Sequence, residues 1–156
     1  MLRFLHWVGI AMWLGAQFTF MVWGPQTRAS SLEAWAHTWK TLAKVQGFII
    51  APAAALATIT GIVMTMQLVG GHVDLGQATS LWLMQGFGLL AAVIAVGVVT
   101  PLANRIAMYA HASLSAGQKD PRAERTRKAL AWAGSITGVL ILVALYFGAQ
   151  APRMLS

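Results

Sequence analysis

The stretch VQGFIIAPAAALATITGIVMTMQL, residues 45–68, has no charged side chain and is long enough to cross a lipid bilayer. Three further stretches share this character: residues 4–23, 81–102 and 129–147. A helix of about 20 residues rises about 30 Å, the thickness of the hydrocarbon core, and satisfies its backbone hydrogen bonds internally. The sequence therefore predicts an all-α fold, an integral membrane four-helix bundle in which residues 1–156 form one transmembrane domain.

The composition excludes several other classes of protein. The chain is 58% hydrophobic and 10% charged, which leaves too little polar surface for a water-soluble domain of this size. The net charge of +7 does not indicate a nucleic-acid partner, because the basic residues bracket the apolar spans and form no patch with aromatic residues. The absence of cysteine excludes disulfides and Cys-based metal sites.

The basic residues predict the orientation in the membrane. Residues 24–44 and 103–128, the first and third connections, contain nine of the eleven Lys and Arg residues, whereas residues 69–80 contain none. Basic loops stay in the cytoplasm, so both termini and residues 69–80 are expected outside a plasma (inner) membrane.

The first basic connection contains an amphipathic pattern. Leu32, Trp35, Trp39 and Leu42 recur at spacings of three and four residues. This pattern predicts an interfacial helix over residues 31–44, between spans one and two, with the two tryptophans as headgroup anchors. A tryptophan-lined binding site is the alternative.

Short sequence motifs recur in the two halves of the chain. Ile-Thr-Gly at residues 59–61 returns at residues 136–138, and Pro25 with Arg28 returns as Pro101 with Arg105, an offset of about 76 residues. We expect a 2+2 parallel internal repeat about an axis along the membrane normal. Small residues at four-residue spacing predict close helix packing, within the bundle or across a homodimer: Ala11, Gly15 and Thr19; Ala53, Ala57 and Gly61; Gly88 and Ala92; Gly134 and Gly138.

Few polar side chains lie within the spans. No Asp, Glu, Lys or Arg is found there, which argues against a proton relay or a carboxylate ion pathway. His6, Trp13 and Gln17 fall on one face of the first helix, which should point into the bundle. With Gln85 of the third span, they are the predicted cofactor-binding residues.

His6 is the candidate metal ligand. Neutral imidazole is the usual protein ligand for heme iron and copper. The outer-loop His72 is a candidate second ligand from the same side of the membrane. The competing interpretations are a water-exposed histidine at a span end and an ordinary Gly-Gly-His turn.

The first span resembles a known family. LHWVGIAMWLG at residues 5–15 is similar to the opening helix of CopD-like and HemJ-like membrane proteins, where a His, a small residue and a Trp precede a Gly. Pro52, Thr60-Gly61 and Trp82 fit the same pattern. The resemblance implies His6 as ligand, copper handling for CopD-like proteins, and heme with protoporphyrinogen oxidation for HemJ-like proteins. HemJ-like proteins also have a His near the end of the first helix and a Lys in the third, where this chain has residues 23–25, Trp-Gly-Pro, and Gln85.

Two functions remain open on the sequence. In the first, the protein binds b-type heme, or copper as the alternative, in electron transfer or in heme and copper handling, and any enzyme activity is that of an oxidoreductase. In the second, it is a non-catalytic accessory or scaffold subunit of a larger membrane complex. In both, the lipid bilayer is a partner and nucleic acid is not.

The orientation can be tested with single cysteines at Ser115 and Ser156. We expect an impermeant thiol reagent to label position 156 on intact cells, and position 115 only after the membrane is opened. The reverse pattern would show that the topology is inverted.

Overall fold

The computed structural model describes residues 1–26, 30–69 and 79–154. Within these ranges, the protein is helical, with four helices long and apolar enough to cross a membrane. Helix α1 is Leu2–Gln26 and α6 is Pro121–Met154. Between them lie two long composite helices. The elements are α2 Leu32–Val45, η2 Gln46–Ile50 and α3 Ala51–Val69 in the first, and α4 Thr79–Ile94, η3 Ala95–Val99 and α5 Thr100–Ala116 in the second.

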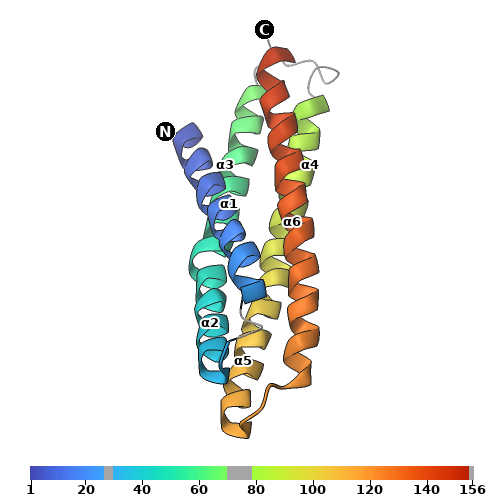
Figure 1. Cartoon of the computed structure of the whole chain (residues 1–156). Helices are drawn as coiled ribbons and strands as arrows, with labels where there is room; N and C mark the ends of the chain where they lie inside the picture. Colours follow the sequence, from blue (N-terminus) through green and yellow to red (C-terminus); the bar gives the residue numbers. More distant parts are fainter. Residues whose placement is uncertain (27–29, 70–78, 155–156) are drawn as a thin grey trace.

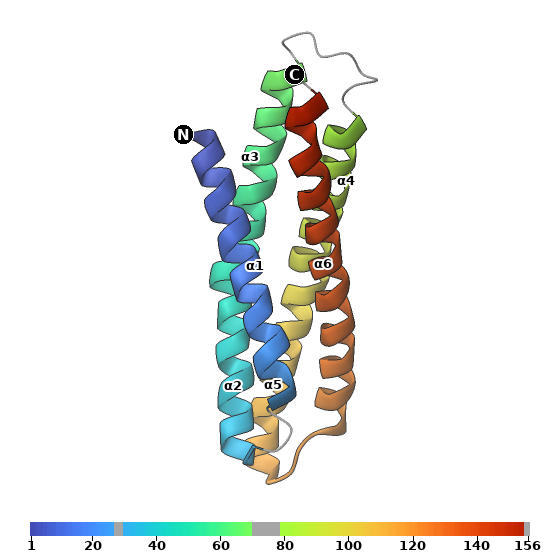
Figure 2. The ribbon, with the colours of Figure 1, turned by 45° about the horizontal axis from the view of Figure 1, so that its top comes forward.

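The four long helices form an elongated bundle. Helix α1 packs on α3, α6 packs on α4 and α5, and α2 packs on α5. Figures 1 and 2 show both termini at one end, whereas the α5–α6 turn lies at the other. Within the described residues, the predicted all-α fold with four long apolar helices is confirmed. Large apolar side chains are exposed on the outside of the bundle, as contact with lipid requires. Among them, Phe48 is 81% exposed and Trp132 is 73% exposed.

Each composite helix contains one wide π-helical turn, and each turn ends two residues before a proline. The N–H of Ala51 bonds to the carbonyl of Gln46, and the N–H of Thr100 bonds to that of Ala95, five residues back in both cases. Proline has no N–H and its ring crowds the carbonyl four residues earlier, so the helix widens there without breaking. Pro52 and Pro101 thus explain the two π-turns.

Gln46 links the two π-turns. Its side chain is fully buried, and its Nε2 donates to the Ala95 carbonyl at 3.2 Å and to Thr100 Oγ1 at 3.1 Å. Thr100 Oγ1 in turn donates to the Ala95 carbonyl at 3.0 Å. A glutamine in the interior of a membrane bundle requires such partners, and here it joins the two composite helices at mid-length.

The composite helices are longer than the hydrocarbon core is thick. The apolar helix Leu32–Gln67 has 36 residues, so it rises about 54 Å against a core of about 30 Å. The segment predicted as a separate interfacial helix is therefore the first arm of the second long helix. Helix α2 begins at Ser31, whose hydroxyl accepts the N–H of Ala34 at 3.3 Å as an N-cap.

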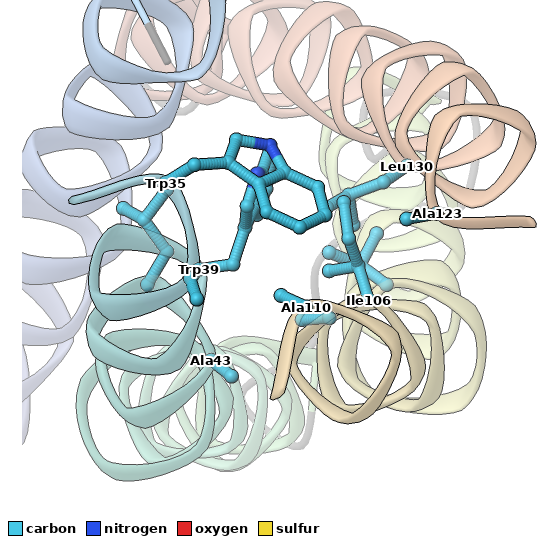
Figure 3. Close-up of a cluster of buried hydrophobic side chains, with 11 residues drawn as sticks. Trp35, Trp39, Ala43, Ile106, Ala110, Ala123 and Leu130 are labelled. Atoms are coloured by element: carbon cyan, nitrogen blue, oxygen red, sulfur yellow. The ribbon is translucent and has the colours of Figure 1, made fainter. Parts of the chain in front are cut away.

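The prediction that the two tryptophans of α2 are headgroup anchors is wrong. Trp35 and Trp39 are 6% and 3% exposed, so they are core residues and not exposed headgroup anchors. Figure 3 shows them facing Ile106 and Ala110 of α5 and Leu130 of α6. Their apolar surfaces form a compact core at the basic end of the molecule, where α2, α5 and α6 pack together.

The small-residue faces are confirmed in part. Ala53, Ala57 and Gly61 lie buried on α3, and α1 approaches so closely that a Cβ on Gly9 would lie 2.9 Å from the Ala57 nitrogen. Gly9, and not Gly15, is the contact glycine of α1, because a Cβ on Gly15 would meet nothing within 4 Å. The internal repeat remains a prediction. A repeat with an offset of about 76 residues would relate the second span to the fourth, whereas the two π-turns lie in the second and third spans.

The α5–α6 turn has well-defined caps. Gly117 adopts a left-handed conformation (φ 69°) after α5, where glycine has no steric cost. Asp120 caps α6 through Oδ1, which accepts the N–H of Arg122 at 2.8 Å, and Pro121 occupies the first turn. The hydrogen bonds from Arg122 hold the pKa of the Asp120 carboxyl below its usual value.

Replacing Ile106 by Ala tests the core at the basic end. This side chain is fully buried, so we expect a loss of about 2–5 kcal/mol in the free energy of unfolding. Met108→Ala is the matched control on the same helix, because Met108 is 59% exposed and should lose far less. Denaturant titration of the protein in detergent micelles measures both, and equal losses would contradict this packing.

Candidate functional site

The hydrogen bonds of His6 determine which of its ring nitrogens carries the proton. Nδ1 lies 2.8 Å from the Ala57 carbonyl and 3.2 Å from Thr60 Oγ1. A carbonyl oxygen only accepts, so Nδ1 must carry the hydrogen and donate it. In the neutral imidazole, Nε2 is then left with its lone pair available.

Thr60 and Gly61 shape the surroundings of the imidazole. Thr60 Oγ1 donates to the Leu56 carbonyl at 2.6 Å, one turn back on α3. A Cβ at Gly61 would lie 3.0 Å from His6 Cε1 and 3.5 Å from Gln85 Nε2. Glycine at this position lets side chains from α1 and α4 meet over the backbone of α3.

Gln85 is also held in one orientation. The hydroxyl hydrogen of Thr65 is donated to the Gly61 carbonyl at 3.0 Å, so its oxygen accepts from Gln85 Nε2 at 2.6 Å. The amide oxygen of Gln85 is therefore directed away from Thr65. The Gln85 amide and the His6 imidazole thus both lie against Gly61 of α3.

His6, Trp13 and Gln85 line one small cavity of about 70 Å³ between α1, α3, α4 and α6. The rest of its wall is apolar or small and includes Gly88, Ile141 and Gly148. The indole Nε1 of Trp13 is buried and has no hydrogen-bond partner among the described residues. The structure therefore brings the side chains of His6, Trp13 and Gln85 to the wall of one mainly apolar cavity.

The other predicted site residues lie elsewhere. Gln17 is on the same face of α1 but donates from Nε2 to the Gly134 carbonyl at 2.7 Å and lines a different cavity. His72 lies outside the described residues. Sequence reasoning missed Thr65 and the Ala57 carbonyl as supporting groups, because a hydrogen bond across two helices leaves no signal in a single sequence.

The ligand set around His6 suits some prosthetic groups better than others. In the described part of the chain, no group of three or more His, Asp or Glu side chains could hold a metal ion. Copper requires several converging imidazole or sulfur ligands. Among the described residues that line the cavity, His6 provides the one imidazole and Met84 a thioether. Heme iron requires one strong axial nitrogen, and a histidine with its Nδ1–H bonded to a backbone carbonyl meets that requirement.

Space is the second requirement. The cavity at His6 is smaller than a porphyrin, but an open groove of about 500 Å³ lies on the other side of Gln85, between α3 and α4. Thr65, Trp82, Gln85 and Leu89 are among its lining residues. A macrocycle near His6 would need side chains such as Gln85 to move.

Comparisons with protein-family models, with curated proteins and with solved structures found no match for this chain.

The protonation of His6 can be tested by ¹⁵N NMR of histidine-labelled protein in detergent at neutral pH. We expect the neutral ring of His6 to carry its hydrogen on Nδ1, because the Ala57 carbonyl accepts it. His37, which is exposed on α2, is the internal reference. A spectrum in which Nε2 of His6 carries the hydrogen would contradict the site geometry.

Proposed function

We propose that this protein is a small membrane haemoprotein in which His6 ligates the iron of a b-type heme, acting in electron transfer or heme handling. The observation that supports it best is the hydrogen bond from His6 Nδ1 to the Ala57 carbonyl, which leaves Nε2 as the available nitrogen in a membrane-embedded cavity. A histidine that merely reached interfacial water would not need this support. The resemblance of residues 5–15 to CopD-like and HemJ-like proteins points in the same direction.

The chain's own residues have definite roles in this proposal. The Ala57 carbonyl fixes the ring orientation and the tautomer. Gly61 provides the room for the imidazole, and the apolar walls exclude water and lower the local dielectric. The buried indole N–H of Trp13 is a donor available to an acceptor on the bound group. When bound, heme would supply one-electron chemistry.

The orientation in the membrane is part of the same proposal. We place the end that carries the α5–α6 turn in the cytoplasm, because Lys40, Lys44 and Arg105 lie towards it, and we place His6 in the outer half of a plasma (inner) membrane. The arm formed by α2 then leaves the bilayer on the cytoplasmic side. A homodimer or a larger complex could use the exposed apolar face of α1 or α6.

Replacement of His6 by Ala tests the ligand. We expect the purified protein to show a Soret band, and the His6→Ala variant to lose most of it while circular dichroism shows an unchanged helical content. His37→Ala and His111→Ala are matched controls, since both histidines are exposed at the other end of the bundle. They should retain the full heme stoichiometry.

A His6→Ala protein that keeps its full heme would overturn the assignment of the ligand. A colourless unaltered protein that takes up no added hemin would favour the accessory-subunit function instead.

A further inference from the structure

A second and larger cavity lies towards the basic end of the bundle, away from His6. Its volume is about 300 Å³, and α1, α2, both π-turns and α6 all contribute to its wall. The lining is mainly apolar and includes the aromatic rings of Phe20 and Trp39. This volume falls in the range of small-molecule sites in proteins.

Two buried polar atoms of this cavity's residues lack partners within the described residues. They are Nε1 of Trp39, an obligatory donor, and Oε1 of Gln46, an obligatory acceptor. Trp39 is 3% exposed and Gln46 is fully buried. An unpaired buried donor or acceptor costs about 1–3 kcal/mol. Both residues line the cavity, but each atom is shielded even from water, so a ligand would reach them only after the two side chains turn towards the cavity.

The orientation of the Gln46 amide follows from its other hydrogen bonds. Nε2 donates to the Ala95 carbonyl, so a flipped amide would place two acceptors against each other. Oε1 is therefore the atom left without a partner. Trp39 and Gln46 are seven residues apart, two turns along one side of the helix and about 10 Å along its axis.

The charges around the cavity favour a neutral ligand. Arg127 is the basic residue in the lining, and Glu124 neutralises it through two hydrogen bonds of 2.6 and 2.7 Å. A phosphate placed here would lose its water without gaining an unpaired cation. The ligand must instead bring an uncharged acceptor for the indole N–H and an uncharged donor for the amide oxygen.

We propose that this cavity binds a lipid-soluble hydroquinone, with one hydroxyl accepting from Trp39 Nε1 and the other donating to Gln46 Oε1. A para-hydroquinone has a hydroxyl at each end of a flat ring, which suits a donor and an acceptor on residues two turns apart along one side of a helix. A quinone has acceptors only and would leave Gln46 Oε1 unpaired. The hydroquinone should therefore bind more tightly than the quinone.

This proposal does not depend on heme at His6. The two cavities share no lining residue, so a His6→Ala protein should bind the hydroquinone as the unaltered protein does. The failure of one proposal is thus distinguishable from the failure of the other.

The test is anaerobic calorimetric titration of the full chain in nanodiscs with decylubiquinol. We expect saturable binding, and a dissociation constant about tenfold larger for the bis-methyl ether of decylubiquinol, which has no hydroxyl donor. Trp39→Phe, which keeps a ring but removes the N–H, should weaken decylubiquinol binding by about fivefold to tenfold. Trp35→Phe is the matched control, since Trp35 is buried on the same helix but does not line the cavity, and its affinity should be unchanged.

Three results would overturn the proposal. They are no saturable binding, equal affinities for decylubiquinol and its bis-methyl ether, and displacement of decylubiquinol by phosphatidylglycerol at equal mole fraction. The comparison of the two ligands uses unaltered protein, so it remains decisive if Trp39→Phe does not fold.

Discussion

Backbone polar groups in a membrane must find hydrogen-bond partners within the protein. In the middle of this bundle, two prolines interrupt the regular helical hydrogen bonds, so other partners are needed there. Pro52 and Pro101 each remove a donor from a long helix, and each helix responds with a π-turn. Gln46 then donates to the Ala95 carbonyl and Thr100 Oγ1 across the gap between the two turns. This contact joins the two composite helices, on which α1 and α6 pack.

The π-turns divide the molecule into two parts with different packing. On one side, the core contains Trp13 and Ile50 but is rich in alanines such as Ala53, Ala57 and Ala91. Such small residues let helix backbones approach closely where lipid provides no hydrophobic force between helices. On the other side, Trp35, Trp39 and Ile106 form a bulkier core like that of a water-soluble protein. The charged residues Lys40, Arg105 and Lys128 surround this second part, in accord with helices that extend beyond the bilayer.

One face of α1 connects the two cavities. His6 and Trp13 line the smaller cavity, and Gln17 and Met21 line the larger one further along the helix. In both cavities the wall is apolar and a buried indole N–H lacks a partner among the described residues. The two proposals therefore concern separate sites on a single helix, one for a metal-bound macrocycle and one for an uncharged ring.

The sequence alone determined the number of apolar spans, the helical class and the inward face of α1, because length, hydropathy and the 3.6-residue period are local properties. It also singled out His6 and Gln85, since polar side chains in apolar spans are few. It could not determine that Trp35 and Trp39 are buried, because an amphipathic helix presents the same pattern to a headgroup layer and to a neighbouring helix. Only the tertiary structure decided this, and it placed Ala57 and Thr60 against His6 and separated Gln17 from that site. These outcomes depend on contacts between residues some 50 or more positions apart, such as His6 with Ala57 and Gln17 with Gly134, which no local pattern encodes.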